Sequence, residues 1–327
     1  MPTTRRAILL SLPGLAAARA GLAQTAAAYP SRAVRVVIPS APGGLTDGFV
    51  RLIGDAMQRA WGQPFVMDHR PGAGGIVGAE HVARSAPDGH TLMMGNIGPL
   101  GINPGLYPRL PYDAARDFAP ISLVAVYPNV LVVNPAVPAR DVAGLVALAR
   151  ARPGALRFAS AGIGQSQHLS GEMFNVTAGV QTTHVPYRGT GPALSDVMGG
   201  HVEMMFSNLP PAVEAIRAGR LRALGVTGTA RSAVLPEVPT IAEAGVPGYE
   251  VFSWIALVGP AGMPGEIIGR LHAETARVAR TEEARRYYLS LGAEPRTDLS
   301  PEQAGAYMQR ERDRWAELIR RADIRPE

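Results

Sequence analysis

The chain has 327 residues, 46% hydrophobic and 18% charged, a composition typical of a globular protein long enough for two domains. It contains no lysine and no cysteine, which excludes Schiff-base and Walker A lysines, thiol catalysis, disulfides, cysteine zinc sites and a lipoprotein anchor. The net charge is +5, and no arginine patch with interleaved aromatic residues is present, so we expect no nucleic-acid partner.

Residues 1–28 have the pattern of a cleavable export signal. Arg5 and Arg6 precede an apolar stretch too short to span a membrane, and small residues favour cleavage near residue 23 or 28. The arginine pair resembles a twin-arginine signal without its Phe and Lys, so the export route stays open, and a buried N-terminal helix is the alternative. We expect a periplasmic mature protein with no membrane insertion.

The first half of the mature chain alternates short apolar strands with amphipathic helices. Residues 33–39 predict a strand, 49–61 a helix, 64–68 a strand, 78–84 a helix and 91–95 a strand. A glycine-rich loop spans 70–78. The proline-rich stretch 103–120 predicts irregular structure and no helix, because proline lacks the N–H that a helix interior needs.

The second half repeats this alternation after two apolar runs, 121–126 and 130–133, which Pro128 separates. We expect the chain to change sheets there and to return after Tyr249, which gives one lobe of 29–126 plus 251–327 and a second of 127–250. The predicted helices are 140–150, 166–178, 190–199, 211–218, 264–280, 281–291 and 300–321, and the predicted strands 155–159, 182–186, 202–206 and 221–227. The fold class is α/β, with mainly parallel sheets flanked by helices.

Two glycine-rich turns, one in each half, follow a strand and precede a helix. They are Ser40–Asp47 and Ser160–His168. Such a turn leaves backbone N–H groups free at a helix N-terminus, where the helix dipole also favours an anion. The pair therefore predicts two lobes that each hold one side of an anionic ligand. The alternative is that both are ordinary strand-to-helix loops.

Short motifs along the whole mature chain resemble the tripartite tricarboxylate transporter substrate-binding receptors, the Bug family. The segments are 29–39, 41–47, 69–75, 86–92, 102–107, 111–118, 185–189, 235–240, 247–249 and 253–254. The resemblance implies a two-lobed periplasmic binding protein of the type II-like class, with the ligand cleft between the lobes. It implies a small organic acid, such as a di- or tricarboxylate, delivered to the large and small membrane subunits of a transporter. We expect a monomer that uses no cofactor and no metal.

The resemblance also assigns ligand-binding residues position by position. They are Ser40, Ala41, Gly43, Gly44, Thr46 and Asp47 in the first turn, Ser160, Ala161, Gly164, Gln165 and Ser166 in the second, and Tyr187, Arg188 and Ser207 at later strand ends. The family often has Asp where Ser207 stands, and a more polar stretch in place of 98–100. Both departures are expected to face the variable side of the ligand.

Several of these residues have a simpler interpretation. Asp47 is favoured as a plain acid at a helix start, Ser166 as a helix cap, and His168 as a packing or helix-surface residue. Arg188 is either the charged partner of the substrate or part of a salt bridge between lobes.

Two other functions remain as alternatives to transport. A ligand sensor would keep the same fold and site. The sequence lacks the motifs of a hydrolase, because His168 stands where the nucleophile elbow requires glycine. No G-x-G-x-x-G pattern is complete, and the seven histidines show no metal-ligand spacing. We therefore expect no enzymatic activity.

Overall fold

The computed structural model describes residues 29–326, and the expected signal segment lies outside them. Their strands follow the order β2-β1-β3-β9-β4-β7-β5-β6, with β8 and β10 pairing to β4. β1 pairs in parallel with β2 and β3, and β5 with β6 and β7, but β9 and β4 run antiparallel to their neighbours. The sheet is therefore mixed, with a parallel group at each end.

The helices and strands agree with the sequence pattern in most places. The strands are β1 Val34–Ile38, β2 Phe65–His69, β3 Thr91–Asn96, β4 Phe118–Val133, β5 Arg157–Ser160, β6 Thr183–Pro186, β7 Met204–Asn208, β8 Arg222–Val226, β9 Phe252–Pro260 and β10 Glu294–Pro295. The α-helices are α1 Leu45–Trp61, α2 Ile76–Ala83, α3 Asn103–Leu106, α4 Val142–Ala151, α5 Ser166–Ala178, α6 Thr190–Met198, α7 Leu209–Arg217, α8 Gly265–Ala279, α9 Glu282–Ser290 and α10 Pro301–Arg321. A 3₁₀ turn, Ala73–Gly75, and a π-helix, Gly98–Ile102, complete the elements.

Two expectations about the middle of the chain are wrong. Residues 103–106 form the short helix α3, because Pro104 lies in the first turn, where a missing N–H costs nothing. The run 118–133 is one continuous strand through Pro128. The strand nevertheless changes partners there: residues up to Pro128 pair with β9, whereas Asn129 onward pairs with β7 and β8.

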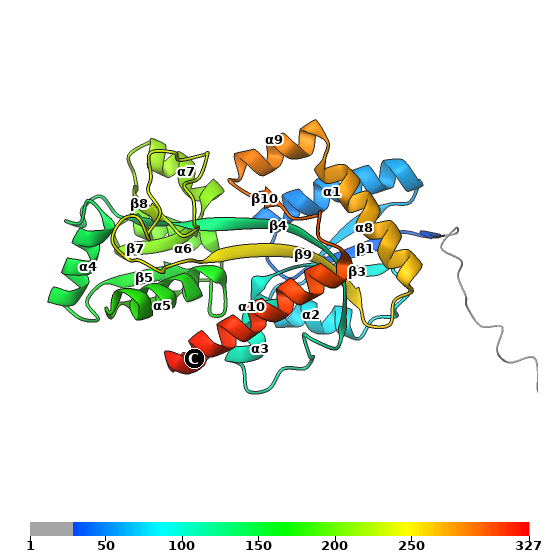
Figure 1. The fold of residues 1–327 in the computed structure, drawn as a ribbon, viewed down its shortest axis with the longest axis horizontal. Coiled ribbons are helices and arrows are strands. Elements are labelled where there is room, and N and C mark those ends of the chain that lie inside the picture. The colour runs from blue at the N-terminus through cyan, green and yellow to red at the C-terminus, as the bar shows by residue number, and fades with distance from the viewer. Residues whose placement is uncertain (1–28, 327) are drawn as a thin grey trace, which may run out of the picture.

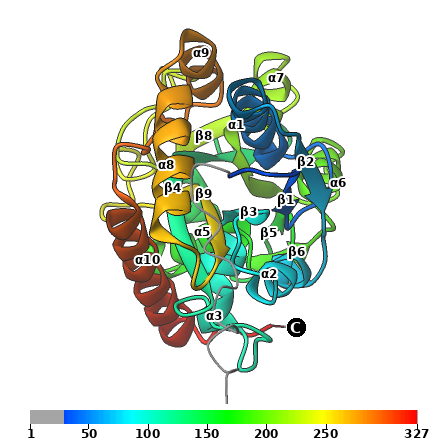
Figure 2. The same cartoon turned by 90° about the vertical axis from the view of Figure 1, so that its right-hand side faces the viewer.

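β4 and β9 connect the two halves of the molecule as long neighbouring strands (Figure 1). β1–β3 with α1, α2, α8 and α9 lie around one end of these strands, and β5–β8 with α4–α7 around the other. Figure 2 shows α8 and α10 on one side of the molecule and α1 and α2 on the other.

The hydrophobic core consists of three clusters of buried side chains. One joins α1, α8 and α9 to a face of the first sheet half, and one joins α6 and α7 to the second half. The third continues across both halves and includes Trp254 and Trp315, which are fully buried. Both indole N–H groups donate to Glu311 Oε2, at 3.3 and 3.1 Å, so α10 is fixed to the long strands. β1 and β5, which precede the two glycine turns, contribute Val37 and Phe158 to the third cluster.

Candidate functional site

The first glycine turn connects β1 to α1 and leaves the helix N-terminus open. Gly44 is the N-cap, with φ −82° and ψ 172°, and no side chain caps the helix. Residues 41–44 are exposed. Within residues 29–326, no protein acceptor takes the N–H groups of Gly44, Leu45 or Thr46. This end of α1 can therefore donate several hydrogen bonds to an anion.

Asp47 positions this turn and is more than a plain helix-start acid. Its Oδ2 accepts the Gly43 N–H at 2.7 Å, and its Oδ1 lies 3.0 Å from His69 Nε2 at the end of β2. Gly43 has a φ of +87°, a conformation that other residues rarely adopt. The carboxylate thus holds this part of the turn in place, and the Gly43 N–H is not free for a ligand.

The second turn connects β5 to α5 and is held by its own side chains. The Gly162 N–H donates to Ser160 Oγ at 3.1 Å, and the Gly164 N–H donates to His168 Nδ1 at 3.3 Å. The N-cap of α5 is Gln165, so the expected capping role of Ser166 is wrong. The Ser166 hydroxyl is buried and faces the Asn129 side-chain amide at 3.4 Å.

The two turns share one construction. In each, a glycine N–H bonds to the side chain four residues later, in the first turn of the following helix: Asp47 for Gly43 and His168 for Gly164. In each, that side chain contacts a histidine of the adjacent parallel strand, His69 or His184. The two halves therefore present equivalent, positioned helix N-termini.

Buried His168 and half-buried His184 form a neutral pair behind the second turn. Their rings stack with centroids 4.0 Å apart and 20° between planes, and His184 Nε2 lies 2.6 Å from Ser160 Oγ. Burial lowers the pKa of His168 to about 4 and, together with the neighbouring imidazole, that of His184 to about 3. The expectation that His168 packs is confirmed, although it is buried and not on the helix surface.

This pair predicts a loss of stability on mild acidification. Because both pKa values are lower in the native state, the unfolded chain binds protons first below pH 6.5, so the free energy of unfolding falls as pH falls. We expect the melting temperature to fall by about 3 °C or more from about pH 7 to about pH 5. His184→Gln, which keeps a polar group near Ser160 but does not titrate, should show a smaller fall in thermal melts. An equal fall would contradict the assignment.

Three predicted site residues have other surroundings. The Tyr187 hydroxyl donates to Asp196 Oδ2 at 2.6 Å, and burial with this hydrogen bond raises the pKa of Tyr187 to about 12. Arg188 is exposed and forms no ion pair within the described chain, so the salt bridge between lobes is absent there. Ser207 is fully buried and donates to the Asn208 carbonyl, so its hydroxyl does not face a ligand in this conformation.

The glycine-rich loop 70–78, to which the sequence assigned no role, lies between the two turns. A Cβ placed on Gly75 would lie 3.3 Å from Pro39, the residue before the first turn. A Cβ placed on Gly74 would lie 3.2 Å from the Ile163 carbonyl oxygen in the second turn. The loop 72–75 therefore lies against the second turn and against the residue that leads into the first.

Asn103 is a further contact that sequence reasoning missed. Its Nδ2 donates to the Gly74 carbonyl at 3.1 Å, its Oδ1 is buried without a partner, and that Oδ1 would lie 2.5 Å from a Cβ on Gly164. Gly164 also has a φ of +74°. This position therefore requires glycine for the packing of the chain itself, whatever ligand binds. The 98–100 segment lies here too, because a Cβ on Gly98 would come 3.2 Å from the Gly164 carbonyl oxygen.

Polar side chains also gather at the carboxyl ends of β6 and β7. Gln167 Nε2 donates to Asn208 Oδ1 and lies 3.4 Å from Thr190 Oγ1. Thr190 follows β6 and Asn208 ends β7, the two strands next to β5, and Gln167 lies in the first turn of α5, so this cluster lies beside the second turn. Asn208, rather than Ser207, presents its side chain to this cluster. Polar residues at the ends of consecutive strands were visible in the sequence. Which of two neighbouring residues points toward the cluster depends on how the strand is paired in the sheet, and the sequence does not show this.

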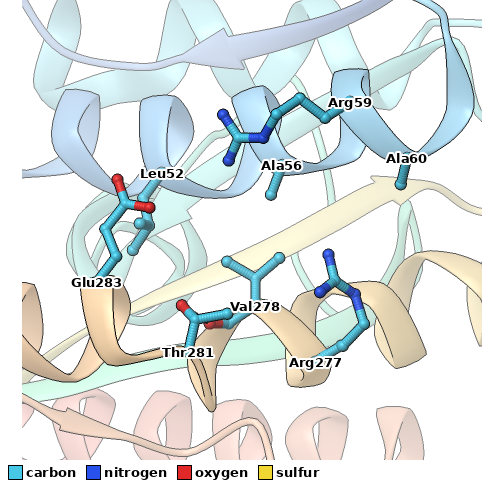
Figure 3. A pocket seen from close by; sticks show the side chains of 8 residues that line it. All are labelled: Leu52, Ala56, Arg59, Ala60, Arg277, Val278, Thr281 and Glu283. Atoms are coloured by element: carbon cyan, nitrogen blue, oxygen red, sulfur yellow. The ribbon is translucent and has the colours of Figure 1, made fainter.

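A separate cavity of about 280 Å³ lies between α1 and the α8–α9 region (Figure 3). Arg59, Arg277 and Glu283 are among its lining side chains, and none of the predicted site residues lines it. Arg277 is already paired with Glu274 at 2.7 Å. The cavity is therefore distinct from the glycine turns.

Residues 29–326 contain no helix long and apolar enough to cross a membrane, and no group of three or more His, Asp or Glu side chains that could hold a metal ion.

Comparison with known proteins identifies the family. The profile of TctC, the tripartite tricarboxylate transporter family receptor, matches residues 49–324. Protein BugT of Bordetella pertussis is 36% identical over 315 residues, which cover 95% of this chain and 96% of that protein. A UPF0065 protein of Pseudomonas sp. strain P51 is 40% identical over 316 residues, which cover 96% of this chain and 94% of that protein.

Solved structures agree with these matches. The R. palustris protein Rpa4515 with adipate has a TM-score of 0.86 and 37% identity, covering 91% of this chain and all of that one. MatC of Rhodopseudomonas palustris with bound malate has a TM-score of 0.82 and 36% identity, covering 89% of this chain and all of that one. The periplasmic binding protein BugD has a TM-score of 0.83 and 31% identity, covering 91% and 100%. The chain belongs to the tripartite tricarboxylate transporter receptor family, the Bug family of solute-binding receptors.

Proposed function

We propose that this protein captures a small organic acid between its two glycine turns and delivers it to the large and small membrane subunits of a tripartite tricarboxylate transporter. The observation that carries the proposal is the pair of equivalent helix N-termini: no side chain caps either helix, and each follows a glycine whose N–H is held by a side chain four residues later. Adipate and malate in the related structures indicate a dicarboxylate.

The turns supply enough hydrogen bonds for a transport receptor. Free N–H groups at the start of α1 hold one side of a carboxylate, and those at the start of α5 hold the other. A hydrogen bond to a charged group contributes about 1.5–3 kcal/mol, so four of them are sufficient for micromolar binding. The proposed ligand contacts are those of Ser40, Ala41, Gly44 and Thr46 with Ala161, Gln165 and Ser166, and Arg188 is an exposed cation free to approach the anion. Gly43, Asp47, Ser160 and Gly164 shape the turns.

Binding requires the two halves to close on the ligand. We propose that residues 29–126 with 251–327 form one lobe and residues 127–250 the other. The change of partners at Pro128 within β4 supports this division, because β4 continues through that point, whereas β9 begins there with Phe252 opposite Pro128. The two crossings, at Pro128 in β4 and at the start of β9, are the proposed hinge.

The Ser160–His184 pair resembles a nucleophile with its base, but we propose a structural role and no enzymatic activity. Ser160 is fully buried, and its oxygen already accepts the Gly162 N–H. A nucleophile must reach its substrate, whereas this hydroxyl is enclosed by the turn that it stabilises.

Export to the periplasm completes the proposal. Residues 1–28 have the composition of a cleavable signal, and BugD is a periplasmic binding protein. We propose that the mature receptor begins near residue 24 or 29 and acts as a monomer.

Calorimetry with adipate, malate and the uncharged adipate analogue adipamide tests the function. We expect one of the acids, or an acid identified by mass spectrometry of protein purified under native conditions, to bind in the micromolar range. Adipamide should not bind, because it offers no charge to the helix N-termini. Equal binding of adipamide, or a co-purified ligand without an acidic group, would contradict the proposal.

A further inference from the structure

The hydrogen bond between Gly164 and His168 fixes the protonation state of the imidazole. An N–H can donate only to an unprotonated nitrogen, so Nδ1 carries the lone pair and Nε2 the proton. His168 is 4% exposed, and its Nε2 lies 4.0 Å from Glu172 Oε1 on the next turn of α5. The ring is thus a neutral acceptor aimed at the turn.

His184 supports both ends of the same turn. Its ring stacks on His168, and its Nε2 contacts Ser160 Oγ, the acceptor of the Gly162 N–H. Phe158 flanks the pair, with its ring centroid 5.0 Å from that of His184. Two stacked rings therefore determine where two glycine N–H groups of the turn point.

A neutral acceptor suits this position. The first turn uses the Asp47 carboxylate, which adds a negative charge beside the proposed anion. At the second turn an imidazole accepts the equivalent N–H without adding charge, so the anion meets no repulsion from that side.

We propose that His168 and His184 are positioning residues for the ligand: the unprotonated Nδ1 of His168 holds the Gly164 N–H, and His184 fixes the His168 ring and Ser160. This inference rests on the proposed function, since it assigns the second turn as half of the anion site. The proposed role of His168 is more than packing, because it requires a hydrogen-bond acceptor at the Nδ1 position of the ring.

The ionisable groups that face His168 are His184 from β6 and Glu172 from α5. Burial raises the pKa of Glu172, and its Oε1 faces the Nε2 of His168 rather than the acceptor Nδ1. A proton on Nδ1 would replace the lone pair and release the Gly164 N–H.

Two substitutions separate the acceptor from the ring. In His168→Asn, the side-chain oxygen can take the place of Nδ1, whereas in His168→Gln it takes the place of Nε2. Both variants lose the stacked ring to a similar degree. In calorimetry with adipate we expect the Asn variant to bind within about threefold of wild type and the Gln variant about tenfold more weakly, as for the loss of one hydrogen bond to the site.

A ligand-free measurement keeps the inference distinct from the function. Nuclear magnetic resonance of the histidine nitrogens should show unprotonated Nδ1 in His168 near neutral pH, and the Gly164 amide should exchange slowly with solvent in wild type and His168→Asn but rapidly in His168→Gln. If the wild-type protein binds no organic acid, the proposed function is wrong, but the nitrogen spectrum and the Gly164 exchange rate still test whether His168 Nδ1 holds the Gly164 N–H. Equal binding of the two variants, or a protonated Nδ1, would overturn the inference, and if His168→Gln does not fold, the nitrogen spectrum of wild type decides.

Discussion

Replacing Gly44 with valine is expected to weaken dicarboxylate binding at least about a hundredfold while the chain stays folded. A Cβ at this position would have ample room within the protein, with the Ala41 carbonyl oxygen 3.8 Å away and Ser40 Oγ 4.0 Å away. The backbone of Gly44 is in an extended conformation that any residue adopts. The added branched side chain therefore has one main effect: it occupies the space over the helix N-terminus that the anion needs.

The matched control is Gly269→Val, which places the same side chain on the exposed surface of α8, where a Cβ meets nothing within 4 Å. Both variants should melt within a few degrees of wild type, and only Gly44→Val should lose heat of binding in calorimetry. Gly164 is unsuitable for this test, because a Cβ there meets Asn103 before it meets any ligand. Wild-type affinity in a folded Gly44→Val protein would remove the first turn from the site.

The fold was predictable where it depends on local pattern. The helices at 140–150, 166–178 and 300–321 were placed to within two residues, because amphipathic spacing and end signals such as Gly179, with a φ of +62°, are written in adjacent residues. The insertion of β9 between β3 and β4 was not predictable, since strand partners are chosen by packing between distant segments. The continuity of β4 through Pro128 was not predictable for the same reason. The division into lobes stays a prediction.

The site was predictable in its backbone and much less in its side chains. Both glycine turns have a recognisable composition, and the structure places each at a helix N-terminus. His69, His184 and Asn103 escaped notice because they reach the turns from other strands and helices, and no motif connects them in sequence. Asp47 and His168 were named from the sequence, and their role as acceptors for a turn glycine could also have been inferred, because each stands four residues after that glycine, within reach of its N–H.

Asp47 offers a test in which two physical effects have opposite signs. If its charge mattered most, removing it would tighten binding of an anion, because a like charge near the site would be gone. If its hydrogen bonds matter most, Asp47→Ala should bind about tenfold or more weakly, because the Gly43 N–H and His69 both lose their partner. We expect the second result, since Gly43 at a φ of +87° has little else to hold it.

Asp47→Asn distinguishes the two effects within one pair of variants. The amide keeps one oxygen for the Gly43 N–H but carries no charge, so we expect its affinity for adipate to equal or exceed that of wild type. Asp55→Ala, which removes an exposed carboxylate from the same helix, controls for the change in net charge and should bind like wild type. Calorimetry at low and high salt completes the comparison, because screening weakens a charge effect but leaves a positional one. Tighter binding by Asp47→Ala would show that the first turn holds its shape without the carboxylate, and that Asp47 serves to moderate affinity rather than to build the site.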